Sequence, residues 1–95
     1  MIHHLKTWPQ FFEFSWGDLK TFEYRKNDRD YKLFDTLNLQ EYDPLPGVYS
    51  GREIVGVVRC IVTEAPGLPK GYCIMQLGGM LKRENSLHEW VQMAA

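Results

Sequence analysis

The sequence predicts an α+β domain, in which one N-terminal helix precedes a meander of short strands that form a small barrel or a strongly curled sheet. Three observations predict this fold class. A single stripe of apolar residues at helical spacing comes first, several strand-like stretches follow it, and few segments can form βαβ crossovers. The 95 residues suffice for one domain with one modest hydrophobic core.

The helix signal lies within residues 5–19. Thr7 can cap the helix, Pro9 is tolerated in its first turn, and Gly17 is a plausible end. The apolar stripe along one helical face consists of Trp8, Phe11, Phe12, Trp16 and Leu19. We expect this face, with both of its tryptophans, to pack in the core; the alternative for the tryptophans is stacking on nucleic-acid bases.

Four strands are expected after the helix. Their aromatic and β-branched stretches are Lys20–Lys26, Thr36–Tyr42, Arg52–Val62 and Tyr72–Leu77. Turn-forming residues separate these stretches, and Gly56 in the third strand is expected to mark a bulge or a bend. In the first strand polar and aromatic residues alternate, which is typical of a strand whose two faces differ.

The last part of the chain is expected to be a separate extension. Gly78 and Gly79 break the strand pattern, and a capping box then begins at Ser86, which predicts a short C-terminal helix. Residues 1–79 would form the domain, and residues 80–95 would be the helical extension. This helix can pack on the sheet, form a homodimer with a second copy of the chain, or dock on a protein partner.

Composition and charge exclude several classes of protein. Hydrophobic residues make up 44% of the chain and charged residues 24%, which excludes a disordered chain, a collagen or an extended coiled coil. No stretch approaches the ~20 apolar residues that span a membrane, and the N-terminus has no apolar run of signal-peptide length. We therefore expect a cytoplasmic protein. Its net charge of −1 excludes a general basic field for nucleic acid.

The cysteines and histidines predict no metal site. Cys60 and Cys73 lack CxxC spacing, and each lies in an apolar run, so we expect two reduced core thiols. Together with His3, His4 and His88 they show no spacing that is typical of metal ligands. We expect neither a metal nor another cofactor.

Residues 20–29, KTFEYRKNDR, contain the candidate site. On a strand, Thr21, Glu23 and Arg25 share one face, where they are costly if buried without partners and useful if they line a cleft. The Arg25 fork suits a carbonyl or phosphate, Glu23 can accept a hydrogen bond from an amine or act as a base, and Lys20 can stabilise an oxyanion. The alternative is a solvated surface strand with cross-strand charge pairs.

Several stretches carry a resemblance to a known family. They are His3-x-Leu5-Lys6, Pro9-x-x-Phe12, the continuous run Lys20 to Tyr31, Leu37-x-Leu39-x-Glu41-Tyr42-Asp43, Tyr49-x-Gly51-Arg52-Glu53-Ile54 and Gly67-Leu68-x-x-Gly71-Tyr72. Through them, the chain from His3 to about Leu77 resembles the DUF3850 family, a branch of the ASCH superfamily within the PUA-like fold. The small proteins that it resembles are often encoded by phages and other mobile elements.

The resemblance implies a small PUA-like β-barrel over residues 1–79, with the helix leading into the first barrel strand. It also implies a cleft where the K-x-x-E-x-R residues gather. ASCH domains are generally proposed to bind RNA or a nucleotide, so RNA or a modified nucleoside is the expected partner. The candidate ligand-binding residues are His3, Lys20, Thr21, Glu23, Arg25, Lys26, Asn27, Asp28 and Arg29.

The resemblance also offers an alternative function. One small bacterial ASCH branch hydrolyses N4-acetylcytidine with a lysine, a threonine and a glutamate. By motif the lysine corresponds to Lys20, whereas the threonine position holds Glu23, so these two residues would be catalytic in such an amidohydrolase. The later glutamate has a weak candidate in Glu64. Two turn positions depart from the family's usual glycine. Asp18 holds one of them, and we expect a remodelled turn between helix and strand there. Phe34 holds the other, where we expect local strain or a different turn type.

Overall fold

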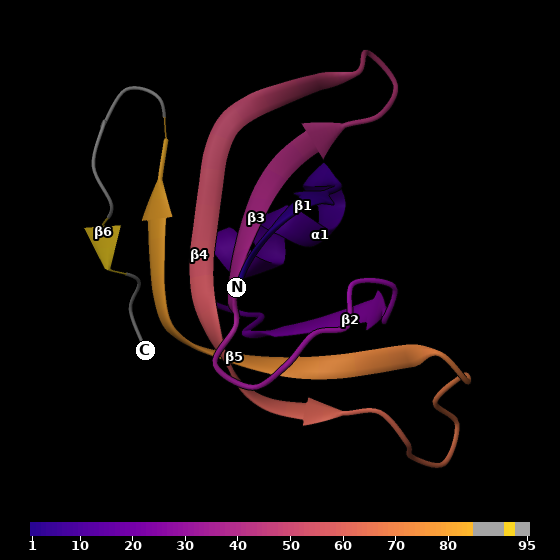
Figure 1. Cartoon of the computed structure of the whole chain (residues 1–95). Helices are drawn as coiled ribbons and strands as arrows, with labels where there is room; N and C mark the ends of the chain where they lie inside the picture. Colours follow the sequence, from indigo (N-terminus) through magenta and orange to yellow (C-terminus); the bar gives the residue numbers. More distant parts are fainter. Residues whose placement is uncertain (85–90, 93–95) are drawn as a thin grey trace.

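The computed structural model describes residues 1–84 and 91–92 and shows a mostly-β protein with one curled mixed sheet and one short helix (Figure 1). The sheet path has the order β1–β3–β4–β5–β2, in which β1 and β3 are parallel and the other neighbours are antiparallel. The elements along the chain are β1 (Ile2–Thr7), α1 (Pro9–Trp16), β2 (Phe22–Lys26), β3 (Thr36–Asp43), β4 (Val48–Val62) and β5 (Tyr72–Arg83).

The curl of the sheet comes from the long strands β4 and β5, which both bend (Figure 1). Their pairing shifts register between Val55 and Val57, which confirms the irregularity predicted at Gly56, and such bulges bend a strand. A Cβ atom at Gly56 would lie 3.1 Å from Leu77 Cβ, so the close approach of the strands favours glycine. The result is a half-barrel whose two edge strands are β1 and β2.

The hydrophobic core lies on the concave side of this sheet, where α1 packs against β3. Alternate residues of the strands supply it, as the period of two requires. The buried hydrophobic residues are Leu5, Phe12, Tyr31, Leu37, Leu39, Ile54, Val58, Cys73, Met75 and Leu77. Burial of these side chains is the main source of stability for a chain of this size.

The start of the chain differs from the prediction. Residues Ile2–Thr7 form strand β1, and the helix covers only Pro9–Trp16, with Trp8 rather than Thr7 as its N-cap. The inward-facing positions of β1 are His3, Leu5 and Thr7. Two of these three residues are polar, so the period-two pattern of this strand is hidden in the sequence.

The predicted apolar stripe of the helix packs only in part. Phe12 is fully buried and Trp16 packs against the core, whereas Trp8 and Phe11 are each 50% exposed and Leu19 is 80% exposed. The helix has only eight residues, and Trp8 and Leu19 lie outside it. A helix of two turns buries one narrow face, which Phe12 and Trp16 occupy at a spacing of four residues.

The four predicted strands are all present, but the last two are longer than expected. Strand β4 begins at Val48, and β5 continues through Gly78 and Gly79 to Arg83, so the prediction that these glycines end the strand was wrong. A Cβ atom at Gly78 would lie 2.9 Å from Arg59 Cγ. Glycine is required at this position because the side chain of Arg59 crosses β5 there.

The helix predicted from Ser86 falls mostly outside the described residues. The two described residues of this segment form strand β6 (Val91–Gln92), which pairs antiparallel with Leu81 and Lys82 of β5. A strand therefore stands where the capping box predicted part of a helix.

The backbone is strained at the turn positions of Asp18 and Phe34, which confirms the strain expected at Phe34. Asp18 has a φ of 65° and Phe34 a φ of 70°, in the left-handed region that favours glycine. Phe34 is held in this conformation by its N–H group, which donates to Val58 O at 2.8 Å, while its side chain is 71% exposed. The pairing of the loop with β4 thus outweighs the local strain.

Phe34 allows this strain to be measured. We expect the variant Phe34→Gly to exceed Phe34→Ala in free energy of unfolding by about 1 kcal/mol, because only glycine adopts the positive φ without strain. The alanine variant is the matched control, since both changes remove the same exposed ring. Urea denaturation measures the difference, and equal stabilities would contradict the prediction.

Candidate functional site

An aromatic groove of about 910 Å³ opens between β2 and the junction of β1 with α1. Its aromatic lining consists of Trp8, Phe11, Phe14, Phe22, Tyr24 and Tyr72. The first five of these side chains are 46–54% exposed, so their faces are available to a ligand. Such a concentration of exposed rings in one hollow is typical of a binding site.

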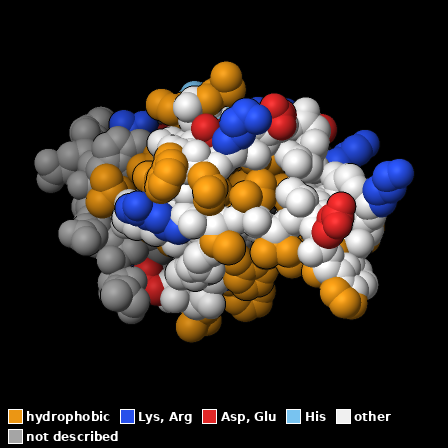
Figure 2. Space-filling view, turned by 60° about the horizontal axis from the view of Figure 1, so that its bottom comes forward, with side chains coloured by type: hydrophobic (Ala, Val, Ile, Leu, Met, Phe, Trp, Pro, Cys, Tyr) orange, Lys and Arg blue, Asp and Glu red, His pale blue; other side chains and the backbone are white. Residues whose placement is uncertain are grey.

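Exposure alone does not define this site. Hydrophobic side chains also gather on the face at the bottom of Figure 1, with charged groups around them (Figure 2). The aromatic groove differs because charged side chains also line it. They are Lys6, Lys20, Glu23, Arg25 and Lys26. A groove that combines aromatic walls with a few placed polar groups suits a planar, polar ligand.

Three of these charged residues form a compact cluster, which we call the Lys20–Glu23–Arg25 triad. Glu23 is only 2% exposed, and its two carboxylate oxygens accept hydrogen bonds from Lys20 Nζ at 2.7 Å and from Arg25 Nε at 2.9 Å. The alternation of β2 turns Glu23 and Arg25 toward the concave side, while Lys20 reaches over from before the strand. The triad therefore satisfies its buried carboxylate and has one net positive charge.

Arg25 also connects the two edges of the half-barrel. Its Nη1 donates to Lys6 O at 3.1 Å and its Nη2 donates to Thr7 Oγ1 at 2.9 Å. Arg29, in the loop after β2, similarly donates from Nη1 to His4 O at 3.1 Å. These arginines reach carbonyl groups of β1, which is an edge strand of the sheet that the described residues form.

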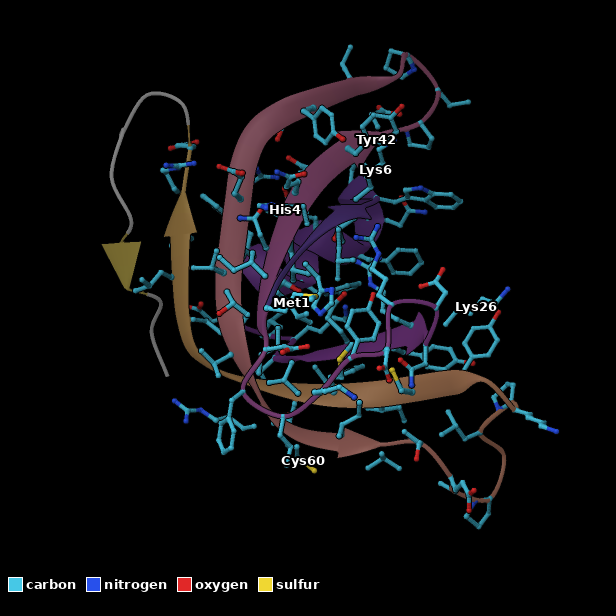
Figure 3. All side chains as sticks on the ribbon, in the orientation of Figure 1. Met1, His4, Lys6, Lys26, Tyr42 and Cys60 are labelled. Atoms are coloured by element: carbon cyan, nitrogen blue, oxygen red, sulfur yellow. The ribbon has the colours of Figure 1, made fainter. Side chains whose placement is uncertain are left out.

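A second, basic groove of about 460 Å³ adjoins the aromatic groove. The two grooves share Lys6, Arg25 and Lys26. The basic groove is further lined by His4, Leu5, Asp28, Arg29, Tyr31, Gln40 and Tyr49. Four of its ten residues are lysine or arginine and one is acidic. Lys6 lies over the ring of Tyr42 at 4.5 Å, and Lys26 lies at the far end of β2 (Figure 3).

The remaining candidate residues are dispersed. Thr21 lies outside both grooves, where its Oγ1 accepts a hydrogen bond from Gln76 at 3.0 Å. Asn27 shapes the loop after β2, because its Oδ1 accepts a hydrogen bond from the Tyr31 N–H. Glu64 is exposed and lines neither groove. Lys20, Glu23, Arg25, Lys26, Asp28 and Arg29 are the predicted residues that the structure gathers at the grooves.

His3 lies outside both grooves as well. It is 5% exposed, its Nε2 lies 2.9 Å from Asp35 Oδ2, and its ring meets that of Tyr31 edge to face at 4.8 Å. The N-terminal ammonium group of Met1 lies 3.4 Å from the other oxygen of Asp35. His3 therefore fixes β1 to the loop before β3.

This contact predicts an acid-sensitive part of the stability. The hydrogen bond from His3 holds the pKa of Asp35 below its ordinary value of 3.8. Burial acts in the opposite direction and raises this pKa, whereas the Lys32 N–H, which donates to Asp35, lowers it further. A lowered folded-state pKa means that the stability from Asp35 is present above that value and is lost as the pH falls through the folded pKa. In urea denaturation, the advantage of the wild type over Asp35→Asn should therefore shrink as the pH falls below 3.8. A constant difference would contradict this.

The aromatic groove was largely missed by the sequence analysis, which placed Trp8 and Phe11 in the core. One signal could have revealed it. Five large aromatic residues occur between Trp8 and Trp16, and a helix of two turns cannot turn all of them toward one core. Some of them had to be exposed, close to the strand that carries the triad.

The two cysteines differ in burial. Cys73 is buried, and this burial raises the pKa of its thiol, but Cys60 is exposed on β4, so the prediction of two core thiols was wrong for Cys60. Within residues 1–84 and 91–92, no three histidine, cysteine or acidic side chains are placed to hold a metal ion. No helix in this described part of the chain is long and apolar enough to cross a membrane.

Comparison with known proteins gives a family and one relative. The family model described as "Domain of unknown function (DUF3850)" matches residues 2–77, which contain β1, α1, β2 and both grooves. An "Uncharacterized 12.9 kDa protein in GpA 3'region" of Escherichia phage P2 is 38% identical over 53 residues, which make up 56% of this chain and 47% of that protein. The matched segment thus covers about half the length of this curated relative. The chain belongs to the DUF3850 family.

Proposed function

We propose that the protein binds a nucleobase of RNA or of a nucleotide in the aromatic groove. The observation that carries this proposal is the arrangement of half-exposed rings around a buried glutamate held between a lysine and an arginine. A nucleobase has two apolar faces and a polar edge, so it needs both kinds of contact. The groove offers both within one hollow.

The rings supply the stacking part of this recognition. Stacking of a base on an aromatic side chain contributes about 1–3 kcal/mol and tolerates any base. Trp8, Phe11 and Phe14 come from the start and outer side of α1, whereas Phe22 and Tyr24 come from the outward positions of β2. A base that enters the groove therefore meets rings from two separate elements.

The triad supplies the polar part. Each Glu23 oxygen accepts one hydrogen bond from the triad and keeps acceptor capacity for an exocyclic amine. Lys20 Nζ uses one of its three N–H groups on Glu23 and can donate another to a carbonyl oxygen. An acceptor beside a donor matches the amino and carbonyl edge of cytosine or guanine.

Two further features support the proposal. The chain resembles ASCH domains, which are generally proposed to bind RNA or a nucleotide, and its half-barrel brings the K-x-x-E-x-R residues to a groove. We propose that this half-barrel is a member of the PUA-like fold, with α1 leading into β2 as the resemblance implies.

Hydrolysis of an acylated nucleoside such as N4-acetylcytidine is the second candidate function. The Lys20 Nζ to Glu23 Oε2 distance of 2.7 Å favours it, because Glu23 can accept a proton from the attacking water while Lys20 stabilises the oxyanion formed at the acyl carbonyl. Glu23 can then return the proton to N4 as the acyl C–N4 bond breaks, which releases acetate and cytidine. Chromatography of N4-acetylcytidine after incubation tests this reaction. Release of cytidine by the wild type and not by Glu23→Gln supports an enzyme; no release leaves a binding protein.

Calorimetric titration with cytidine and with N4-acetylcytidine tests the proposed binding. We expect Phe22→Ala to weaken binding by roughly five- to hundredfold, since one stacked ring contributes about 1–3 kcal/mol. Leu45→Ala is the matched control, because Leu45 is a 95% exposed hydrophobic residue that lines neither groove. Equal affinities of both variants and the wild type would contradict the proposal.

A further inference from the structure

The basic groove lies outside the proposed base site, yet four of its ten lining residues are lysine or arginine. Lys6, Arg25, Lys26 and Arg29 line it, with Asp28 as the one acid among its lining residues. The whole chain has a net charge of −1, so this concentration of positive charge is local. A hollow of this kind attracts an anion.

The acids near this groove do not neutralise it. Glu23 is already paired with Lys20 and Arg25. Asp30 pairs with Lys32 at 3.1 Å, where both side chains are well exposed and neither lines the groove. Among the described residues that line the groove, Asp28 is therefore the one acid beside the four cations.

The cations also keep donors that the fold does not use. Within the described residues, Lys26 Nζ has no side-chain hydrogen bond or ion pair, and Lys6 Nζ meets only the ring of Tyr42. Arg29 uses one N–H group on His4 O, and Arg25 uses three on Glu23, Lys6 and Thr7. A guanidinium has five N–H groups, so both arginines can still donate to phosphate oxygens.

The basic groove is continuous with the proposed base-binding site. Lys6, Arg25 and Lys26 line both hollows, so an anion beside them lies next to a base in the aromatic groove. In a nucleic-acid strand, the groups that lie next to a base in this way are the phosphates of the backbone. A free nucleoside would leave the basic groove without a ligand.

We propose that the ligand is a single-stranded nucleic acid of two or more nucleotides, whose base enters the aromatic groove while its sugar-phosphate backbone continues into the basic groove. This inference rests on the proposed function and names its substrate class. In the aromatic groove, the rings and the triad hold the base. In the basic groove, the four cations hold the phosphates. Affinity from cationic contacts depends on salt, whereas stacking depends on it far less.

A six-nucleotide oligocytidylate RNA and cytidine are the probes that test the inference. We expect the hexamer to bind at least about tenfold more tightly than cytidine, with an affinity that falls as salt rises. Lys26→Ala and Arg29→Gln should each weaken hexamer binding more than cytidine binding, and each should reduce the salt slope by roughly 0.7. Lys26→Ala removes no side-chain hydrogen bond or ion pair within the described residues, so it tests the groove without a loss of folding contacts.

Lys70→Ala is the matched control, because Lys70 is an exposed lysine that lines neither groove. A DNA hexamer distinguishes the two sources of such a strand: equal binding supports contacts through phosphate alone, and tighter RNA binding supports an added contact to the 2′-hydroxyl. Equal affinity for hexamer and cytidine, or equal loss in all three variants, would overturn the inference and leave the base site standing. Failure of both probes to bind would overturn the proposed function itself.

Discussion

Replacing Glu23 with glutamine is expected to lower the affinity for a nucleoside at least about tenfold and the free energy of unfolding by about 2 kcal/mol. Glu23 is the anion between Lys20 and Arg25, and it is almost fully buried. A glutamine amide has one oxygen, so its NH₂ group must face one of the two cations. The change preserves the shape of the side chain, removes its charge and replaces one acceptor oxygen with a donor.

Both effects can be measured on one purified variant. Calorimetric titration with cytidine gives the affinity, and urea denaturation gives the free energy of unfolding. Glu64→Gln is the matched control, because Glu64 is exposed and lines neither groove. If Glu23→Gln binds and unfolds like the control, the triad has neither of the two roles assigned to it.

Removal of Arg52 is expected to cause the largest loss of stability, about 3–5 kcal/mol for Arg52→Ala. Arg52 donates from Nε and Nη2 to the two carboxylate oxygens of Glu41, each at 2.9 Å, and Nη2 also contacts Glu13. The Glu41 side chain is 8% exposed, so without Arg52 it would be a buried charge with no cation. The guanidinium also lies 4.8 Å from the ring of Trp16.

The loss should depend on pH in a defined direction. Burial alone raises the pKa of Glu41, but the hydrogen bonds from Arg52 outweigh burial and hold that pKa below its ordinary value of 4.5. The stability from this pair is therefore present above pH 4.5 and is lost as the pH falls through the lowered pKa. The difference between the wild type and Arg52→Ala should shrink on acidification.

The variant Glu13→Gln shows how much of the loss comes from the exposed Arg52–Glu13 pair and how much from the buried Arg52–Glu41 pair. The Glu13 side chain is 61% exposed, so its contact with Arg52 contributes at most about 1 kcal/mol. Urea denaturation should therefore rank Arg52→Ala far below Glu13→Gln in stability. Because Arg52 ties α1 to the sheet through Glu13 and Trp16, its loss should also weaken binding in the aromatic groove. Equal stability of the two variants would contradict this interpretation of the network.

The sequence predicted best those features that depend on neighbouring residues in the chain. The alternation of Lys20–Lys26 predicted β2, and it placed Glu23 and Arg25 on one face, as the structure shows. The same alternation places Lys20 on the opposite face. Its long side chain nevertheless returns to Glu23, because a buried carboxylate requires a cation more strongly than a surface lysine requires solvent.

What the sequence could not predict depends on contacts between distant residues. Strand β1 is defined by its parallel pairing with β3, in which His3 lies opposite Leu37, and no local pattern reports such a partner. Strand β5 continues through Gly78, where the side chain of Arg59 on β4 leaves no room for a Cβ atom. The aromatic groove exists because α1 turns one narrow face to the core and leaves Phe11 on the outside.

The most direct test of a base in the aromatic groove is an NMR titration of the ¹⁵N-labelled chain with cytidine 5′-monophosphate. Binding as proposed should shift the indole N–H signal of Trp8 and the amide signals of Lys20 and of residues 22–26, which line the groove. The indole signal of Trp16, which packs against the core, serves as the internal reference. Shifts confined to these groove residues would support the proposed site. An unchanged spectrum, or shifts that cluster away from both grooves, would contradict it.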